Sequence, residues 1–390
     1  MTKLEQLINE LCPNGVEYKT LGEIAVDVFR GAGIKRDEVT EEGVPCVRYG
    51  EIYTTYGVWF DECVSHTVLE NVPTPKYFEY GDILFAITGE SVEEIAKSTA
   101  YVGHDKCLAG GDIVVLKHNQ NPKYLAYALA TTDAQMQKSK GKVKSKVVHS
   151  SVPAIKEIVV PIPPLPVQSE IVRILDNFTE LTAELTAELT ARKQQYEYYR
   201  DTLYTIDDSE IEWTTLNKIS VNCDRQRKPV TKGNRVSGKY PYYGASGIVD
   251  YVEDYIFDGD FLLVSEDGAN LLARSTPIAF SISGKNWVNN HAHVLKFDTY
   301  ELRRYVEIYL NSIDLSRYIS GGAQPKLNQE NLNKIPIPVP SFERIKFVVD
   351  ILDRFDTLCN DISEGLPAEI EGRRKQYEYY RDKLLTFKVK

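Results

Sequence analysis

The chain has 390 residues and a formal net charge of −10, and its 43% apolar and 26% charged residues are typical of a soluble globular protein of two or three domains. No stretch approaches the roughly 20 apolar residues of a membrane span, and the N-terminus MTKLEQLINEL carries acidic residues where a signal peptide is apolar, so we expect a cytoplasmic protein. The six cysteines lie far apart without a CxxC pair, which argues against a disulfide framework or a zinc site.

The first part of the chain, residues 1–160, alternates short apolar runs with turns. GVPCVRYGEIY, YGDILFAI and GDIVVLKH predict strands, with one or two short helices between them, and hence a mixed α+β domain. The proline-rich PIPPLP ends this domain because proline continues neither a ladder nor a helix. In residues 161–206, apolar residues recur every three or four positions, which predicts a central helix about 55 Å long from about 168 to 204.

The central helix contains the tetrad repeat LTAELTAELTA, from Leu181 to Ala191. Four residues advance a helix by about 6 Å and turn it about 40° beyond a full circle, so the repeat is expected to act as a spacer. Residues 207–340 then repeat the strand-rich pattern, with DFLLVS and HAHVLKF, and end in PIPVPS. The distal region, residues 341–390, is again helical, with an expected kink at Pro367.

The two halves of the chain are copies of one unit. QYEYYRD occurs at 195–201 and at 376–382, and PIPPLPVQSEIVRILDNF matches PVPSFERIKFVVDILDRF. VEYKTLGEIA likewise matches IEWTTLNKIS, and YLAYALATTD matches YVEIYLNSID, while the intervening interiors hardly agree. We therefore expect two α+β domains related by pseudo-twofold symmetry and joined by two long helices that form an antiparallel coiled coil, with a domain at each end. Tyr196, Tyr199, Tyr377 and Tyr380 would pack at the helix seam or, alternatively, form a docking surface for another protein.

Taken together, these segments resemble the specificity subunit of type I restriction-modification systems, over the whole chain. The resemblance rests on RGAGIKRDEVTEEGVPCVRYGEIY, GDILFAITGESVEEIAKS, YPYYGASGIVDYVEDYIFDGDFLLVSEDGANL, NNHAHVLK, GGAQPKLNQENLNKIPIPVP and the twin QYEYYRD segments. The tetrad repeat is similar to the TAEL-type spacer of one subclass. The resemblance implies a non-catalytic subunit whose two target-recognition domains each read half of a bipartite, asymmetric double-stranded DNA site.

The resemblance also implies partners. Two modification subunits would dock on the helical regions and methylate adenines with S-adenosylmethionine, and restriction subunits would join with ATP and magnesium, while this chain would bind no cofactor or metal itself. Five lysines follow one another in QMQKSKGKVKSK, and a second basic run is DRQRKPVTKGNRVSGK. A run of one charge is usually a solvated face, but two runs in two halves favour phosphate contacts.

Residues that read DNA are expected to be loop-borne polar, basic and aromatic side chains. In the first domain we expect the DNA-binding residues to be Lys35, Arg36, Arg48, Tyr49, Tyr53, Ser91, Lys138, Lys140, Lys142, Lys144 and Lys146. In the second domain we expect them to be Tyr242, Tyr243, Ser246, Asn289, Asn290, His291, Gln324 and Lys326. For each, the alternative is a solvent-exposed side chain or one that supports the fold.

Three other interpretations remain open in the sequence. Asp27 to Gly33, DVFRGAG, fits the glycine turn of adenine methyltransferases and NPKY at 121–124 is similar to their NPPY motif, so the chain could itself be a stand-alone methyltransferase. NPKY, however, lacks the second proline, and no α/β alternation surrounds either segment. His291 and His293 could share a metal, although a structural or DNA-facing role is favoured. The third is a helical scaffold that binds no DNA.

Overall fold

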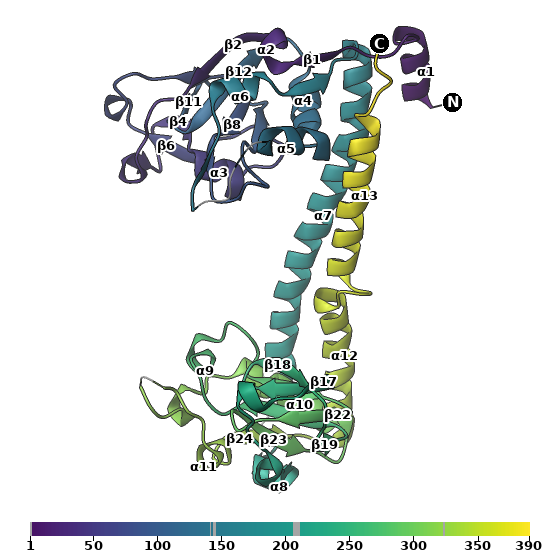
Figure 1. Ribbon diagram of the computed structural model, residues 1–390. Coiled ribbons are helices and arrows are strands. Elements are labelled where there is room, and N and C mark those ends of the chain that lie inside the picture. The colour runs from purple at the N-terminus through teal and green to yellow at the C-terminus, as the bar shows by residue number, and fades with distance from the viewer. Residues whose placement is uncertain (1, 141, 143–145, 206–210, 323) are drawn as a thin grey trace. The chain divides into compact units, whose positions relative to one another are not determined.

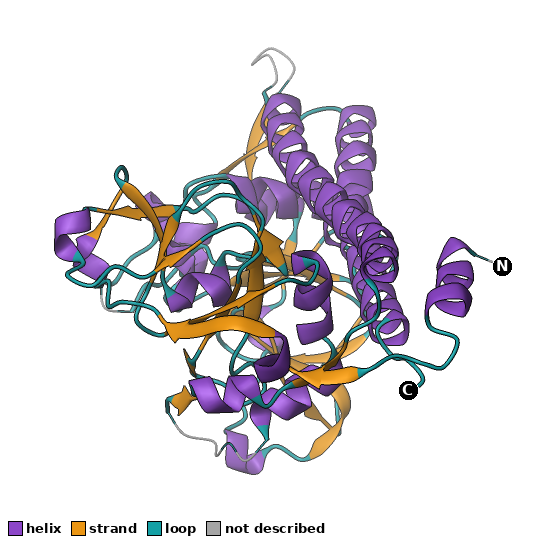
Figure 2. Ribbon diagram, turned by 90° about the horizontal axis from the view of Figure 1, so that it is seen from above, coloured by secondary structure: helices purple, strands orange, loops and turns teal. Residues whose placement is uncertain are grey.

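The structure is a computed structural model that describes residues 2–140, 142, 146–205, 211–322 and 324–390 (Figure 1). The chain forms two compact units, residues 1–186 together with 369–390, and residues 187–368. Each unit combines strands and helices, which Figure 2 distinguishes by colour. Helix α7 (Leu165–Tyr204) is 40 residues long and runs from the first unit into the second.

The first unit contains two five-stranded sheets and two short strand pairs. One sheet has the order β2 (Ala25–Arg30), β12 (Ile113–His118), β8 (Ile83–Ala86), β10 (Ser98–Tyr101), β5 (Trp59–Phe60). The other has the order β3 (Val39–Thr40), β6 (Ser65–Thr67), β4 (Val44–Val47), β11 (Cys107–Ala109), β7 (Tyr77–Phe78). The pairs are β1 (Tyr18–Thr20) with β14 (Val159–Pro161), and β9 (Thr88–Gly89) with β13 (Val148–His149).

The central strands of the first unit are buried on both faces. In β12, Val114 and Leu116 belong to one core cluster, whereas Ile113 and Val115 belong to another. Alternate side chains of a strand point to opposite faces, so a continuous apolar run fills two cores at once. The helices of this unit are α1 (Lys3–Leu11), α2 (Leu21–Ile24), α3 (Tyr49–Thr54), α4 (Pro122–Leu129), α5 (Thr132–Ser139), α6 (Val152–Lys156) and most of α13 (Leu366–Leu384).

The second unit repeats this arrangement with fewer strands. Its sheets have the orders β16 (Val221–Asn222), β23 (Ala292–Lys296), β20 (Phe261–Ser265), β21 (Ala279–Ile282), and β18 (Gly247–Val252), β17 (Ser237–Gly244), β22 (Lys285–Val288), β19 (Phe257–Asp258). β15 (Glu212–Thr215) pairs with β24 (Pro336–Val339), as β1 pairs with β14 in the first unit. The helices are α8 (Leu216–Ile219), α9 (Asn270–Ala273), α10 (Tyr300–Ser312), α11 (Gln329–Leu332) and α12 (Phe342–Asn360). The expected duplication of a mixed α/β domain is thus confirmed.

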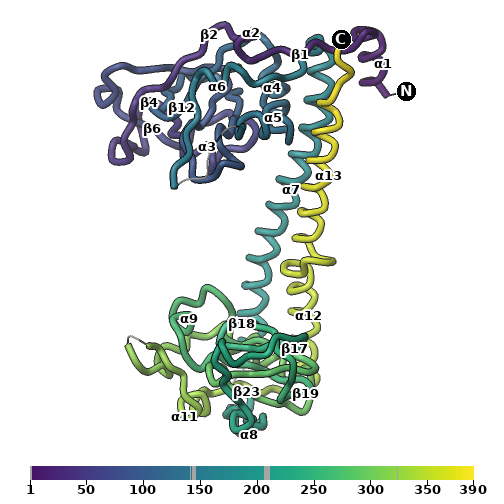
Figure 3. The backbone as a smooth tube through the Cα atoms, viewed as in Figure 1, coloured from purple at the N-terminus to yellow at the C-terminus, as the bar shows by residue number. Residues whose placement is uncertain are grey.

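The distal helical region is broken rather than kinked. α12 ends at Asn360 and α13 begins at Leu366, so Pro367 stands in the first turn of a new helix, where its missing N–H costs nothing. The tube in Figure 3 leaves the helical path between α12 and α13 but follows α7 without a break. No helix within the described ranges combines the length and the apolar composition that crossing a bilayer requires.

Within each unit, α7 lies antiparallel to one distal helix, and the repeated heptapeptide forms this contact. In the first unit Tyr380 of α13 stacks on Phe178, and in the second Tyr199 of α7 packs against Phe355 of α12. Tyr377 packs edge-on against Tyr127 of α4. Tyr199 and Tyr380, which hold the same place in the two heptapeptides, therefore take the expected seam role, whereas Tyr377 contacts the domain helix α4.

Candidate DNA interface

An open groove of about 630 Å³ in the first unit, here called the first-unit groove, brings together Arg36, Arg48 and Tyr49. Arg36 begins the short 3-10 turn η1 (Arg36–Glu38), and Arg48 is the residue before α3. Glu51, which is buried, accepts from the backbone N–H of Arg48 at 3.0 Å and from its Nε at 3.2 Å. The carboxylate therefore holds the Arg48 guanidinium at the groove, a geometry that suits recognition of a guanine edge or a phosphate.

The other residues predicted in the first domain lie outside the lining of this groove. Lys35 is exposed beside it and pairs with Glu38 at 3.1 Å. The Tyr53 hydroxyl donates to the carbonyl oxygen of Ala86, and burial raises the pKa of Tyr53 to about 12, so this side chain serves the core more than the surface. Ser91 donates to Glu93 at 2.6 Å inside a turn.

The lysine run does not form one uniform surface, and the prediction for Lys138 is wrong. Its Nζ is buried, donating to the carbonyl oxygen of Leu129 at 2.7 Å and to the Ser98 hydroxyl at 3.1 Å, so it cannot reach a phosphate. Burial, and secondarily the charge of Arg381, lowers the pKa of Lys138 to about 7. Lys140 and Lys146 are exposed and Lys142 is half-buried, while Lys144 lies outside the described residues.

In the second unit, four segments are tied together into what we call the turn cluster, residues 244–247, 265–268, 289–291, and 320–327 without residue 323, which lies outside the described residues. The Ser265 hydroxyl donates to the carbonyl oxygen of Ala245 at 2.5 Å, and the backbone N–H of Glu266 donates to the carbonyl oxygen of His291 at 2.9 Å. Leu327 in turn donates its N–H to the Glu266 carbonyl oxygen at 2.7 Å. Turns from distant parts of the sequence are thus fixed side by side, as a surface that reads several bases requires.

A buried charge network lies beneath the turn cluster. His293 places Nδ1 2.6 Å from Asp224 and Nε2 2.7 Å from the Leu327 carbonyl oxygen, and Arg227 Nη1 lies 2.6 Å from Glu266. Burial alone would raise the pKa of Asp224, but the His293 ring, the Val294 N–H and the charge of Arg227 together outweigh burial and lower the pKa. Asp224, Glu266 and His293 could by geometry hold a cation, yet Arg227 already forms ion pairs with both carboxylates.

Five predicted residues are exposed on the turn cluster: Ser246, Asn290, His291, Gln324 and Lys326. His291 lies 2.8 Å from Asp267, not beside His293, so the two histidines have different partners. Lys326 contacts Glu266 at 3.1 Å.

The remaining predicted residues of the second domain support the fold. The prediction for Tyr242 is wrong, because this side chain is buried, accepts from the backbone N–H of Val230 and lies under Arg235. Tyr243 is half-buried against Phe280, and Asn289 is buried and holds the backbone of His291. The sequence did not identify Asp224 or Glu266 as supports of this surface, although Asp224 stands out as the one acidic residue of the second basic run.

The two methyltransferase-like segments have structural roles. A Cβ at Gly31 would collide with the carbonyl oxygens of Ala109 and Gly110, so this glycine allows close packing of backbone on backbone. Asn121 caps α4 by accepting from the N–H of Tyr124 at 3.1 Å, and Tyr124 is buried with its hydroxyl donating to Pro161.

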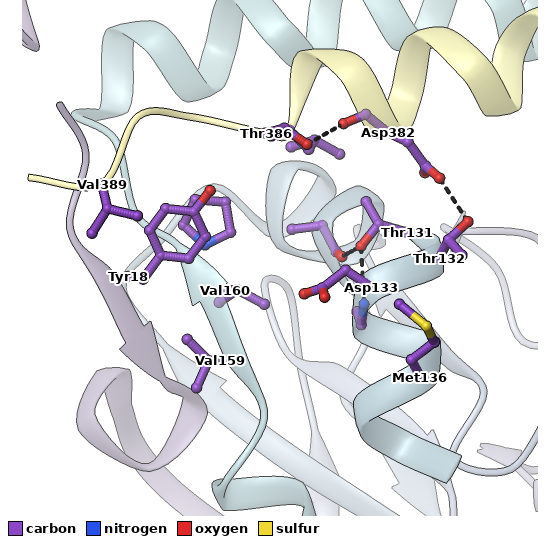
Figure 4. Close-up of a pocket in the computed structure, with 14 residues that line it drawn as sticks. Tyr18, Thr131, Thr132, Asp133, Met136, Val159, Val160, Asp382, Thr386 and Val389 are labelled. Atoms are coloured by element: carbon purple, nitrogen blue, oxygen red, sulfur yellow. Dashed lines mark hydrogen bonds between the residues drawn. The ribbon is translucent and has the colours of Figure 1, made fainter. Parts of the chain in front are cut away.

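A separate cavity of about 520 Å³ in the first unit lies between Tyr18, the start of α5 and the C-terminal segment (Figure 4). Asp382 at its edge accepts from the Thr132 hydroxyl at 2.6 Å. None of its lining residues is among those predicted to bind DNA.

Comparison with known proteins places these features in context. The model of the family described as type I restriction modification DNA specificity domain matches residues 13–192 and again residues 212–372. A putative type I restriction enzyme specificity subunit, S.HindORF215P of Haemophilus influenzae, is 38% identical over 185 residues, which cover 46% of this chain and 48% of that protein. The EcoR124I/EcoR124II specificity subunit of Escherichia coli is 35% identical over 257 residues, covering 60% of this chain and 63% of that protein.

Two solved structures share the fold. The S subunit of a type I restriction-modification system from M. genitalium is similar with a TM-score of 0.58 at 16% identity, covering 96% of this chain and 97% of that one. A chain from a study of complex assembly and conformational transition of the type I R-M system has a TM-score of 0.61 at 15% identity, covering 96% and 98%.

Proposed function

We propose, because the chain belongs to the family of type I restriction modification DNA specificity domains, that it is the DNA sequence-specificity subunit of a type I restriction-modification complex. In this role it would act in the cytoplasm without catalysing a reaction itself. Residues 1–160 and 207–340 would be the two target-recognition domains, and residues 161–206 and 341–390 the helical regions that separate them. The stand-alone methyltransferase is not supported, since its two motifs serve a close backbone contact and a helix cap.

The observation that carries this proposal is a duplicated scaffold with two unlike exposed surfaces. β1–β14 and β15–β24 match in pairing, while the first-unit groove offers Arg36, Arg48 and Tyr49 and the turn cluster offers Ser246, Asn290 and His291. One scaffold bearing two different polar surfaces suits a target made of two different half-sites. Lys140 and Lys146 would contact phosphates.

We further propose that two copies of one modification subunit dock on the helical regions. Exposed apolar residues recur at matched places of the two copies: Leu165 (53% exposed) with Phe342 (49%), and Tyr198 (66%) with Tyr379 (61%). Apolar residues that stay exposed at the same places in both copies favour a partner that binds twice. The partner would supply S-adenosylmethionine chemistry, and restriction subunits would add ATP- and magnesium-dependent cleavage through the complex.

The test is co-expression of the chain with its modification subunit, followed by mapping of methylated adenines on genomic DNA. A bipartite motif with a fixed unread gap supports the proposal, and a continuous motif, or methylation by this chain alone, refutes it. Arg36→Ala should relax recognition in one half-site and Asn290→Ala in the other, each by roughly 1–3 kcal/mol of discrimination. Tyr198→Ser and Tyr379→Ser should each remove one modification subunit, as measured by native mass spectrometry.

A further inference from the structure

Each unit fastens its α/β domain to its helix segment through an ion pair at the same place in the duplicated sequence. In the first unit Lys123 Nζ lies 2.8 Å from Asp176 Oδ2. In the second unit Arg304 Nε lies 2.7 Å from Asp353 Oδ1. The cation comes from the domain helix, α4 or α10, and the carboxylate comes from the connector helix, α7 or α12.

The two pairs are true counterparts. Lys123 and Arg304 each stand one residue before the matched segments YLAYALATTD and YVEIYLNSID, and the two aspartates each end the ILD of the matched segments RILDNF and DILDRF. Both copies place a cation and an aspartate at these matched positions, with lysine as the cation in the first copy and arginine in the second. The pair therefore serves something that the two units share, and not the individual half-site that each would read.

In the first unit, both oxygens of the Asp176 carboxylate are engaged from α4. Tyr127, a buried residue, donates its hydroxyl to Asp176 Oδ1 at 2.7 Å while Lys123 occupies Oδ2. On its other side the Lys123 ammonium lies 3.6 Å from the ring centre of Trp59 in β5. A continuous set of directional contacts thus leads from a sheet strand through α4 to α7.

In the second unit, Arg304 is held by three carboxylates, with Asp356 at 2.7 Å and Glu307 at 2.6 Å in addition to Asp353. Glu307 also accepts from the Ser281 hydroxyl of β21 at 2.5 Å, which continues the connection into the sheet. Burial alone would lower the pKa of Arg304, but Glu307 and the two aspartates outweigh burial and raise it. Arg304 therefore contacts two carboxylates of the connector helix, Asp353 and Asp356, whereas Lys123 contacts one, Asp176.

We propose that Asp176 and Asp353 are positioning residues that fix the angle of each α/β domain on its connector helix, and thereby the gap between half-sites that the protein accepts. Apolar packing between a domain and a helix is non-directional and permits small rotations. A hydrogen-bonded ion pair is directional, so a rotation of the domain on the helix would break its hydrogen bonds. The inference rests on the proposed function, since it concerns how far apart two half-sites may lie.

The test uses the complex with the modification subunit and the bipartite motif mapped for the unaltered protein. Methylation rates are compared on DNA with the native gap and with gaps one base pair longer or shorter. Asp176→Asn should raise the relative rate on the altered gaps by roughly three- to tenfold, while discrimination within each half-site stays unchanged. Glu79→Gln, which removes the same charge from an ion pair with Lys117 away from the helical regions, is the matched control and should change neither the gap selectivity nor the discrimination within each half-site.

The unequal partners give a second expectation. Asp353→Asn should relax the gap less than Asp176→Asn, because Arg304 keeps its contact with Asp356 of α12, and adding Asp356→Asn should remove that protection. Asp176→Asn could lower the melting temperature so far that the complex fails to assemble. In that case Lys123→Gln is the test variant, because it leaves the hydrogen bond between Tyr127 and Asp176 in place.

The inference is overturned if Asp176→Asn and Lys123→Gln keep the native gap selectivity, or if they reduce methylation equally at every gap. Failure of the unaltered complex to methylate any split motif would instead count against the proposed function, and would be seen before any variant is made.

Discussion

The hydroxyl of Tyr18 bonds the backbone of Phe387 in both directions, donating to its carbonyl oxygen at 3.2 Å and accepting from its N–H at 3.1 Å. Beside this contact Val16 donates its N–H to the Lys388 carbonyl oxygen at 2.8 Å, and Leu385 is buried in the core of the first unit. Residues from the two ends of the sequence thus complete one unit.

Removal of residues 385–390 should therefore destabilise the first unit. The loss of buried Leu385 and of the backbone hydrogen bonds predicts a decrease of about 3–5 kcal/mol in its free energy of unfolding. Tyr18→Phe alone should cost about 1 kcal/mol. Denaturant titration with a probe in the first unit measures both. Trp213→Phe, at the matching place in the second copy but half-exposed, is the control and should have little effect; an unchanged midpoint in the truncated chain would contradict the expectation.

The buried Lys138 should make stability depend on pH. Its pKa is about 7 in the folded chain, whereas an unfolded lysine titrates near 10.4. Between these values the unfolded chain binds one more proton than the folded chain, so the free energy of unfolding should rise with pH, by up to about 1.4 kcal/mol per unit.

Lys138→Met removes the titrating ammonium, so the free energy of unfolding should rise less with pH than it does in the unaltered chain. Denaturant midpoints at pH 7 and pH 9 for both proteins give the comparison, in which all other groups cancel. A parallel pH dependence of the two proteins would show that the Lys138 ammonium keeps its charge on folding.

The exposed and buried lysines of one run should behave differently toward DNA. Lys140→Ala and Lys146→Ala should each weaken binding and reduce the slope of log K against log salt by about 1, because each releases a phosphate contact. Lys138→Met should leave the slope unchanged, since its ammonium is bonded inside the protein. If Lys140→Ala and Lys146→Ala both keep the slope of the unaltered chain, the lysine run has no role in binding.

The tetrad repeat in α7 should set the length of the unread gap. Adding one LTAE tetrad between Leu181 and Ala191 lengthens the helix by about 6 Å and adds about 40° of rotation, close to the twist of one base pair. We expect the methylated motif to gain one base pair in its gap with both half-sites unchanged. Sequencing of methylated adenines decides this, and a motif with its former gap would refute the spacer role.

Much of this architecture could be predicted from the sequence, because short segments specify their own secondary structure. The proline-rich ends of the domains, the 3.6-residue periodicity of α7 and the unbroken apolar run DILFAI each specify a local structure with little help from distant residues. The duplication needed only the comparison of the chain with itself. In the distal region, by contrast, Pro367 was expected to kink a helix, and the chain instead starts a new one, because the first turn of a helix tolerates proline.

Only the tertiary structure decided which side chains of a matching type face solvent. Lys138 and Lys140 are two residues apart in one basic run, yet one is buried under Ser98 and Leu129 while the other is exposed. Tyr242 lies in a strand, where neighbouring side chains point to opposite faces, and its own face is the buried one. The network of Asp224, Glu266 and His293 joins residues up to 69 positions apart, a closeness that no local pattern encodes because it arises when distant turns pack together.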